Sequence, residues 1–334
     1  MIGFEENEIS KNANGGTELV KRRVAALLDQ DLLSNFQIIS SRIRELDESK
    51  IRIMWSHDLP EDPESEKMRD KKFRDKFHKM VFVSDWQYQR YQLICGLPYD
   101  TKSVVFEHGI VPFDASVLDK PKDIIRIVYI STPQRGLELV IPVFKHLAEK
   151  FSNIHLDVFS SFNIYGWENA DEPYKPLFDE ITAHSQMTYH GSVSNDELRE
   201  HLAKSHILAY PSIWLETACL SLMESMSAGL LCVHPNYGAL SETSAGLTIM
   251  YQGSFEDKNE HANVFVNYLE AAINLIVEDK QSDMIGYNKF YVDNKFNINR
   301  VKNKWEGLLK DLLIKYPTPE SRAFPKEMFT YRTT

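Results

Sequence analysis

Ten short runs of β-branched and aromatic residues alternate with longer segments of helical periodicity, and this alternation constrains the fold most. Many of the runs are apolar at nearly every position, which predicts parallel strands covered by helices on both faces. The runs form two series, which begin at Phe36, Ile51, Met80 and Ser103, and at Ile124, Ile154, Gln186, His206, Leu230 and Leu247. Because ten strands are many for one doubly wound sheet, we predict two Rossmann-like α/β domains.

The polar segment between Val111 and Asp123 carries two prolines and separates the two series of strands. A length of 334 residues suits two domains, at about 150 residues per domain. We expect a short N-terminal domain over residues 1–118, a second domain over 119–293, and a C-terminal helix and arm over 294–334 that crosses back to the first domain. Helical periodicity is clearest over residues 17–33, 137–150, 196–204 and 261–277.

Composition excludes several classes of function. Lys and Arg number 38 against 48 Asp and Glu, so the net charge is −10. This charge argues against a nucleic-acid partner, because neutralising phosphates needs a basic face. The three cysteines, Cys95, Cys219 and Cys232, have no paired spacing, which predicts a reduced, cytoplasmic environment without structural zinc. We also expect no signal peptide and no membrane span.

The first candidate site is Gly15-Gly16, the only Gly-Gly pair, which opens a predicted helix. Glycine lets the backbone approach a ligand, and the free N–H groups at a helix start attract anions. The alternative is an ordinary loop before a helix. A doubly wound domain usually opens with a strand, so residues 1–4 form either a stunted first strand or none.

A second candidate site follows the strand predicted from Ile124, where the chain runs through Ser131 and Thr132 to Arg135. A cation at a helix start opposes the helix dipole unless an anion lies between them. Two hydroxyls, free amides and a guanidinium suit a diphosphate. The alternative is an exposed Arg135 that pairs with a carboxylate such as Glu138.

The third candidate site consists of Glu216 and Glu224, which lie eight positions apart. Glu216 follows a predicted strand at its carboxyl end, where ligands of open parallel sheets bind. Glu224 falls in the middle of an otherwise apolar predicted helix, where a carboxylate is costly unless it accepts hydrogen bonds, for example from ribose hydroxyls. The alternative is two solvated acids on a helix face.

A fourth candidate is His57, which follows the strand predicted from Ile51, again at its carboxyl end. A neutral imidazole at this position can exchange hydrogen bonds with a substrate hydroxyl. The alternative is a structural histidine.

Seven Lys or Arg residues lie between Lys67 and Lys79, with Phe73, Phe77 and Met80 on one helical face. This pattern predicts a basic amphipathic helix over residues 66–80, which would contact an anionic membrane surface or a polyanionic acceptor. The alternative is a solvated helix whose aromatic side chains pack inward.

Several common motifs are absent. The eleven His show no H-E-x-x-H and no paired metal spacing. There is no G-x-G-x-x-G, no P-loop and no G-x-S-x-G. We therefore expect no bound metal, no nicotinamide cofactor and no serine nucleophile.

Taken together, the segments resemble the family 4 glycosyltransferases, which are retaining enzymes of the GT-B fold. The most specific part is the Glu-x7-Glu pattern, present here as "PSIWLETACLSLMESMSAGLLCV" with Glu216 and Glu224 in register. The segments "NGGTE", "VFVSDWQ", "FEHGIVPF", "GALSE" and "HGSVSNDEL", which contains Val193, match further motifs. The resemblance implies two Rossmann-like doubly wound domains that face an interdomain cleft, with a shortened N-terminal domain.

The resemblance also implies roles for individual residues. Glu224 would hold the nucleotide ribose, Glu216 the donor sugar and Arg135 the diphosphate. His57 would lie near the anomeric carbon. The remaining implied donor-binding positions are Gly15, Gly16, Ser131, Thr132, Val193, Thr217, Ala218, Cys219 and Leu220. The family's second diphosphate cation has no counterpart beside Arg135, and Thr217-Ala218-Cys219 replaces its usual Gly-Phe-Gly.

The implied function is metal-independent transfer of a sugar, with retention, from a nucleotide diphosphate sugar to a hydroxyl of a glycan, lipid or other acceptor. No cofactor is needed beyond the donor. The alternatives are a non-catalytic nucleotide-sugar-binding protein, or another GT-B enzyme such as a sugar-nucleotide 2-epimerase. The expected location is the cytoplasm, at the periphery of a membrane if the basic segment binds one.

Overall fold

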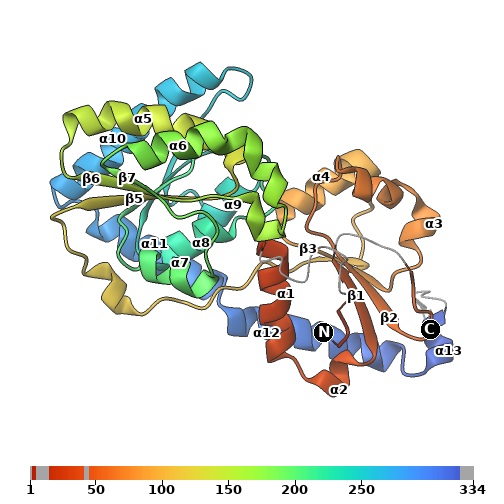
Figure 1. The fold of residues 1–334 in the computed structure, drawn as a ribbon. Helices are drawn as coiled ribbons and strands as arrows, with labels where there is room; N and C mark the ends of the chain where they lie inside the picture. Colours follow the sequence, from red (N-terminus) through yellow and green to blue (C-terminus); the bar gives the residue numbers. More distant parts are fainter. Residues whose placement is uncertain (1, 5–14, 41–44, 324–334) are drawn as a thin grey trace. The chain divides into compact units, whose positions relative to one another are not determined.

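The computed structural model describes residues 2–4, 15–40 and 45–323. The chain divides into two compact units (Figure 1). Unit 1 holds residues 2–4, Leu19–Gly109 and the described residues from Ile298 onward, and unit 2 holds residues 15–18 and Ile110–Asn297. The expected boundaries lay at residues 118/119 and 293/294, whereas the units divide at 109/110 and 297/298.

Unit 1 is built on a four-stranded parallel sheet with the order β1-β2-β3-β4. The strands are β1 (Phe36–Ser40), β2 (Ile51–Trp55), β3 (Lys79–Phe82) and β4 (Ser103–Val105). All four lie where the apolar runs predict them. Every residue of β2 is buried, as expected for a strand covered on both faces.

Residues 2–4 form a turn that ends in one bridge to the sheet of unit 1. Phe4 makes a single parallel bridge to Ile38 of β1, and the Gly3 carbonyl accepts a 2.7 Å hydrogen bond from the Ile38 N–H. Gly3 has φ +76°, and a Cβ there would lie 2.6 Å from the carbonyl oxygen of Leu33. Glycine is therefore required at this turn, and the contribution of residues 2–4 to the sheet is this single bridge.

The helices of unit 1 come from both ends of the chain. They are α1 (Gly16–Leu27, whose first residues group with unit 2), α2 (Gln30–Leu33), α3 (Lys71–Arg74), α4 (Asp85–Cys95), α12 (Ile298–Lys315) and α13 (Pro319–Ala323). Trp305 of α12 packs edge-on against Trp55 of β2, with ring centroids 4.9 Å apart. Arg52 of β2 donates a 3.1 Å hydrogen bond to the carbonyl of Arg322 in α13. The last helices thus complete the core of unit 1.

The predicted basic amphipathic helix over residues 66–80 is wrong. A 3₁₀ helix (Pro63–Arg69) and the four-residue α3 occupy this stretch, and β3 begins at Lys79. Asp70 separates the two helices because its backbone is extended and its side chain accepts a 2.9 Å hydrogen bond from the Lys72 N–H. Phe77 and Met80 are fully buried, so the apolar side chains do pack inward, as the alternative interpretation held.

Unit 2 is built on a six-stranded parallel sheet with the order β10-β9-β8-β5-β6-β7. Its strands are β5 (Ile125–Ile130), β6 (Ile154–Phe159), β7 (Met187–Tyr189), β8 (Ile207–Ala209), β9 (Leu231–Pro235) and β10 (Ile249–Tyr251). All six were predicted from the apolar runs. The strand order reverses between β5 and β8, which are direct neighbours although β6 and β7 lie between them in the sequence.

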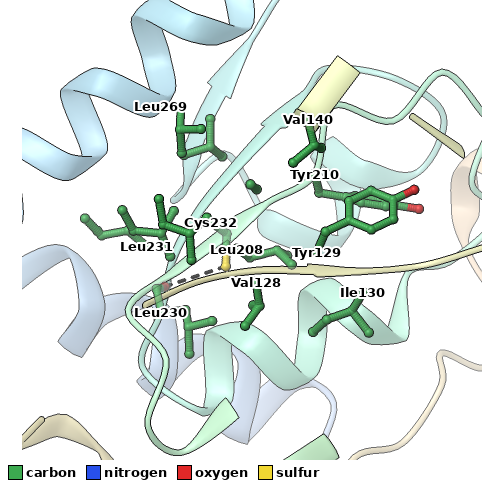
Figure 2. Close-up of a cluster of buried hydrophobic side chains, with 14 of the residues drawn as sticks. Val128, Tyr129, Ile130, Val140, Leu208, Tyr210, Leu230, Leu231, Cys232 and Leu269 are labelled. Carbon is green, nitrogen blue, oxygen red and sulfur yellow. Dashed lines mark hydrogen bonds between the residues drawn. The ribbon is translucent and has the colours of Figure 1, made fainter. Parts of the chain in front are cut away.

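Helices cover both faces of this second sheet. They are α5 (Leu137–Lys150), α6 (Lys175–Ala183), α7 (Asn195–Leu202), α8 (Leu220–Ser227), α9 (Leu240–Ser244), α10 (Lys258–Val277) and α11 (Ser282–Lys295). In Figure 1, α5, α6 and α10 cover one face, and α7, α8 and α11 cover the other. Figure 2 shows the resulting core, with Val140 and Leu269 on one side of the strands and Val128 and Ile130 on the other.

The three cysteines are buried free thiols. Cys232 lies within the core in Figure 2, where its thiol contacts the carbonyl of Leu230 at 3.6 Å. Among the described residues, no helix combines the length and apolar character that crossing a membrane requires.

Candidate functional site

The candidate site lies in unit 2, at the point where the strand order reverses. β5 and β8 are neighbours there, and the helices that follow them along the chain, α5 and α8, cover opposite faces of the sheet. Open parallel sheets bind ligands at such a point. The loop after β5 carries Ser131, Thr132 and Arg135, and the loop after β8 carries Tyr210 and Glu216. The topology therefore joins two of the segments that the sequence singled out.

Backbone contacts hold these two loops together. The Ile213 N–H donates a 3.2 Å hydrogen bond to the carbonyl of Arg135. Gly136 has φ +126°, and a Cβ at this position would collide with the carbonyl of Pro211. Only glycine allows both the backbone angle and the close approach. Gly136 is thus the residue that lets the two strand-end loops touch.

A buried ion pair joins the loops through their side chains. The Arg135 guanidinium lies 2.5 Å from the Glu216 carboxylate, which is 5% exposed as a residue. The Tyr210 hydroxyl donates a 2.6 Å hydrogen bond to the same carboxylate oxygen. Trp214 stacks against the guanidinium with 5.6 Å between the charged carbon and the ring centroid. Glu216 therefore has two strong donors on one oxygen.

Burial and charge shape the ionisation of this group. Burial alone would lower the pKa of Arg135, but the Glu216 carboxylate, Tyr210 and Tyr165 outweigh it and raise that pKa well above its ordinary value. Burial raises the pKa of Tyr210, and the neighbouring Glu216 raises it further. At neutral pH Arg135 is a fixed cation and Tyr210 is a neutral hydrogen-bond donor.

The loop from Thr132 to Arg135 keeps polar atoms without partners. The Thr132 hydroxyl, the Gln134 side-chain oxygen and Arg135 Nε are buried, and none has a hydrogen-bond partner among the described residues. Each such atom costs about 1–3 kcal/mol. Three of them within four residues indicate a polar ligand that would satisfy them.

Glu224 lies in the middle of α8, where the sequence placed it, and is 3% exposed. The Asn195 side-chain amide donates a 3.1 Å hydrogen bond to one carboxylate oxygen, and the Arg199 guanidinium lies 3.7 Å from the other. Arg199 also stacks on the Phe113 ring, 3.8 Å from its centroid. Protein groups therefore supply contacts that the sequence analysis had assigned to a ligand.

Asn195 and Arg199 were missed from the sequence. Asn195 is the first residue of α7 and Arg199 lies four residues further along the helix, so both project from one face. This spacing was the available signal. It could not show that the face meets Glu224, because α7 and α8 belong to different parts of the chain.

The remaining predicted donor-binding residues also fall in unit 2. Gly15 precedes α1, and a Cβ there would collide with the Tyr165 ring, while one on Gly16 would lie 3.5 Å from Leu220. Thr217 and Ala218 form the loop between Glu216 and α8, Cys219 is the residue before α8 and Leu220 is its first residue. Val193 is partly buried against the core.

His57 lies in unit 1, directly beyond β2, and is 7% exposed. Its Nδ1 lies 3.3 Å from Nε2 of His108, which follows β4. Burial, His108 and Lys21 lower the pKa of His57 well below its ordinary value. Burial, together with Arg23, lowers the pKa of His108 to about 4. The pair is therefore neutral at pH 7.

Residues 113–290, more than half of the chain, match the protein-family model described as "Glycosyl transferases group 1". This protein is a group 1 glycosyltransferase. The matched region contains Arg135, Glu216 and Glu224. The search of curated proteins found no match to the sequence of this chain.

Solved structures show the same architecture. A glycosyltransferase from Rickettsia africae aligns with a TM-score of 0.65 and 16% identity over 92% of this chain and 84% of that one. Sucrose-phosphate synthase from Thermosynechococcus elongatus aligns with a TM-score of 0.63 and 13% identity, over 89% of this chain and 78% of that one. HepE of Anabaena, solved with UDP and glucose, aligns with a TM-score of 0.61 and 14% identity, over 88% of this chain and 82% of that one. These likenesses show the fold, and the predicted GT-B class is confirmed.

Proposed function

We propose that this group 1 glycosyltransferase moves a sugar, with retention of configuration, from a nucleotide diphosphate sugar to a hydroxyl of a glycan or lipid-linked acceptor. The observation that carries the proposal is the buried Arg135–Glu216 pair at the strand-order reversal of unit 2, beside three unpartnered polar atoms. A diphosphate offers acceptor oxygens to the two donors among these atoms, the Thr132 hydroxyl and Arg135 Nε. The HepE structure holds UDP, which supports a uridine donor as the first to test.

The donor would lie along the carboxyl ends of β5 and β8. Arg135 Nε and the Thr132 hydroxyl would donate to the diphosphate, since both are buried donors without described partners. Glu216 presents one oxygen to Arg135 and Tyr210, and its other oxygen would accept from a sugar hydroxyl. Glu224 would accept from the ribose hydroxyls, with Asn195 and Arg199 holding the carboxylate in place.

Arg199 is our candidate for the second cation, because no Lys or Arg stands beside Arg135 in its loop. Its guanidinium is held by the Phe113 ring and lies 3.7 Å from Glu224. That position would set its charge near the ribose and the adjoining phosphate.

The transfer step would need no nucleophile from the protein. The bond between the anomeric carbon and the leaving phosphate oxygen breaks, and the acceptor oxygen bonds to that carbon from the same face. The proton of the acceptor hydroxyl passes to the leaving diphosphate. Arg135 would stabilise the negative charge that develops there. His57, neutral at pH 7 because its pKa is lowered, would hydrogen-bond to a sugar hydroxyl near the reacting carbon.

A thermal-shift screen of the full chain against UDP, GDP, ADP, CMP and dTDP sugars tests donor binding. A ligand at 100 times its dissociation constant stabilises the fold by about 2.7 kcal/mol, which is readily measured. The Glu224→Ala variant should lose most of this stabilisation, because the ribose contact is removed. Glu180→Ala, at an exposed ion pair on α6, is the matched control and should keep it.

Product analysis then separates the candidate activities. Transfer to an added acceptor with an unchanged anomeric configuration, at equal rates with and without added Mg²⁺, supports the proposal. An inverted product would rule out retention. Formation of a 2-epimer without acceptor would identify an epimerase, and stabilisation by a donor without any product would identify a binding protein.

A further inference from the structure

A cluster of His and Asp side chains lies in unit 2 and takes no part in the proposed transfer. Asp157 of β6, His190 just beyond β7 and His201 of α7 each offer one ligand atom, and the three atoms lie within 4.8 Å of one another. Asp157 Oδ1 and His190 Nε2 are 2.9 Å apart. The three residues are separated by 32 and 10 intervening positions in the sequence, so only the fold brings them together.

Strand register explains why these side chains meet. Asp157 of β6 pairs with Thr188 of β7, which places His190 beside Phe159, two residues further along each strand. The His190 ring stacks on the Phe159 ring, with centroids 4.3 Å apart and an angle of 8°. His201 reaches the same face from α7, and its ring lies 4.7 Å from that of His190. Packing therefore holds the His190 imidazole in place, with the His201 imidazole beside it.

The surroundings favour a ligand set rather than an isolated ion pair. Arg126 of β5 lies 3.3 Å from Oδ2 of Asp157, which orients the carboxylate and leaves Oδ1 toward the histidines. Partners of this kind orient metal ligands in known sites. The Asp157 side chain is 5% exposed and that of His190 is 18% exposed. Solvent therefore reaches the imidazole that lies beside the buried carboxylate.

We propose that Asp157, His190 and His201 bind one divalent transition-metal ion, with Zn²⁺ as the favoured ion. Two imidazoles and a carboxylate are typical ligands of zinc and its neighbours, whereas Mg²⁺ and Ca²⁺ prefer oxygen ligands alone. A tetrahedral zinc site places its ligand atoms roughly 3.3 Å apart. The Asp157–His190 pair is already near this spacing, and rotation of the His201 side chain would complete the set. Water would fill the fourth position.

Binding requires a definite rearrangement of one hydrogen bond. With the ion present, the His190 proton resides on Nδ1, so Nε2 and Asp157 Oδ1 both turn their lone pairs to the metal instead of sharing a proton. His155, whose Nε2 lies 4.0 Å from Oδ1 and 2.9 Å from the Thr188 hydroxyl, stays outside the three-ligand set.

The ion would fasten α7 to the sheet. The same helix carries Asn195 and Arg199, which contact Glu224. A metal at His201 would therefore fix the helix that holds this carboxylate. This consequence rests on the proposed role of Glu224, whereas metal binding itself does not.

Isothermal titration of the full-length, chelator-treated chain with Zn²⁺ tests the site. We expect one saturable equivalent, and we expect His190→Ala and His201→Ala to weaken binding at least about 100-fold, since even second-shell changes cost 10–100-fold. His146→Ala, an exposed histidine on α5, is the matched control and should bind as the wild type does. Co²⁺ at the same site should give the visible absorption of a four-coordinate centre, and His201→Ala should abolish it.

The outcomes are distinguishable from those of the proposed function. A wild-type chain that binds no Zn²⁺, or a folded His201→Ala variant that binds it unchanged, overturns the metal site, whatever the donor screen shows. Circular dichroism of both variants without metal establishes folding. If His190→Ala does not fold because its stack on Phe159 is lost, His201→Ala still decides, since His201 is only partly buried.

Discussion

The two parallel sheets of this glycosyltransferase differ in strand order and in what stands at their carboxyl ends. The described strands of unit 1 follow one another in sequence order, whereas those of unit 2 reverse between β5 and β8. Beyond the strands of unit 1 lie two neutral imidazoles, His57 and His108, and at the reversal of unit 2 lies the ion pair of Arg135 and Glu216. Strand order decides where loops diverge, and charged ligand-binding groups gather at that point.

The strongest test of this difference is Arg135→Ala. Removing the cation should lower kcat for transfer from a defined donor by about 100- to 1000-fold, as loss of one preorganised donor does elsewhere. Glu216 would also lose its buried partner. Lys145→Ala, which removes an exposed cation on α5, should leave kcat unchanged. Full activity in Arg135→Ala would mean that the strand-order reversal is not where transfer is catalysed.

Acid should destabilise unit 1 through its pair of buried imidazoles. His108 has a pKa of about 4 because it is buried, while in an unfolded chain its pKa is near 6.5. The unfolded state therefore binds more protons between these values, and stability falls as the pH drops from 6.5 toward 4. The loss from this residue is about 3 kcal/mol.

Urea unfolding at pH 7 and pH 5 measures this dependence on acidity. His108→Gln should reduce the difference between the two free energies, and the exposed His146→Gln should not. An unchanged difference in His108→Gln would show that the imidazole pair of unit 1 is not what acid disrupts.

Tyr210→Phe should have a smaller effect on unit 2. It removes the 2.6 Å hydrogen bond to Glu216 but keeps the ring in the core, so we expect a loss of about 1.5–3 kcal/mol in unfolding free energy. Steady-state kinetics should show a raised KM for the donor, since Glu216 loses one of the groups that orient it. Val140→Ala is the control: it should lower the free energy of unfolding by removing buried side-chain atoms from the core of unit 2, and it should leave the KM for the donor unchanged.

The smallest effect concerns the basic segment of unit 1. Asp70→Ala should lower the free energy of unfolding by about 1 kcal/mol, because Asp70 caps α3. If one continuous helix ran through residues 66–80, the same change would raise stability, since Ala is the better helix former. The sign of the change in a urea titration distinguishes the two structures.

The elements were predictable from the sequence where a local pattern determines them. All ten strands formed at their apolar runs, and Glu216, Glu224 and Arg135 all lie in unit 2. Strand order, and with it the contact between the loops after β5 and β8, depends on pairing between distant segments. No pattern within one segment contains that information.

Two sites show the limits of local reasoning. Between Lys67 and Lys79 the charge pattern predicted a helix, but the cap at Asp70 and the pairing of β3 with β2 outweighed it. The cluster of Asp157, His190 and His201 shows no metal spacing in the sequence, because register between β6 and β7 creates it.

The closure of unit 1 by α12 has a consequence for biosynthesis. Trp55 can pack against Trp305 only after the whole of unit 2 has emerged from the ribosome. Domains generally fold as they are made, so unit 2 should fold first. Until α12 is synthesised, the Trp55 indole in the sheet of unit 1 lacks its packing partner. Nascent chains halted before Ile298 should therefore be chaperone substrates, and full-length chains should not.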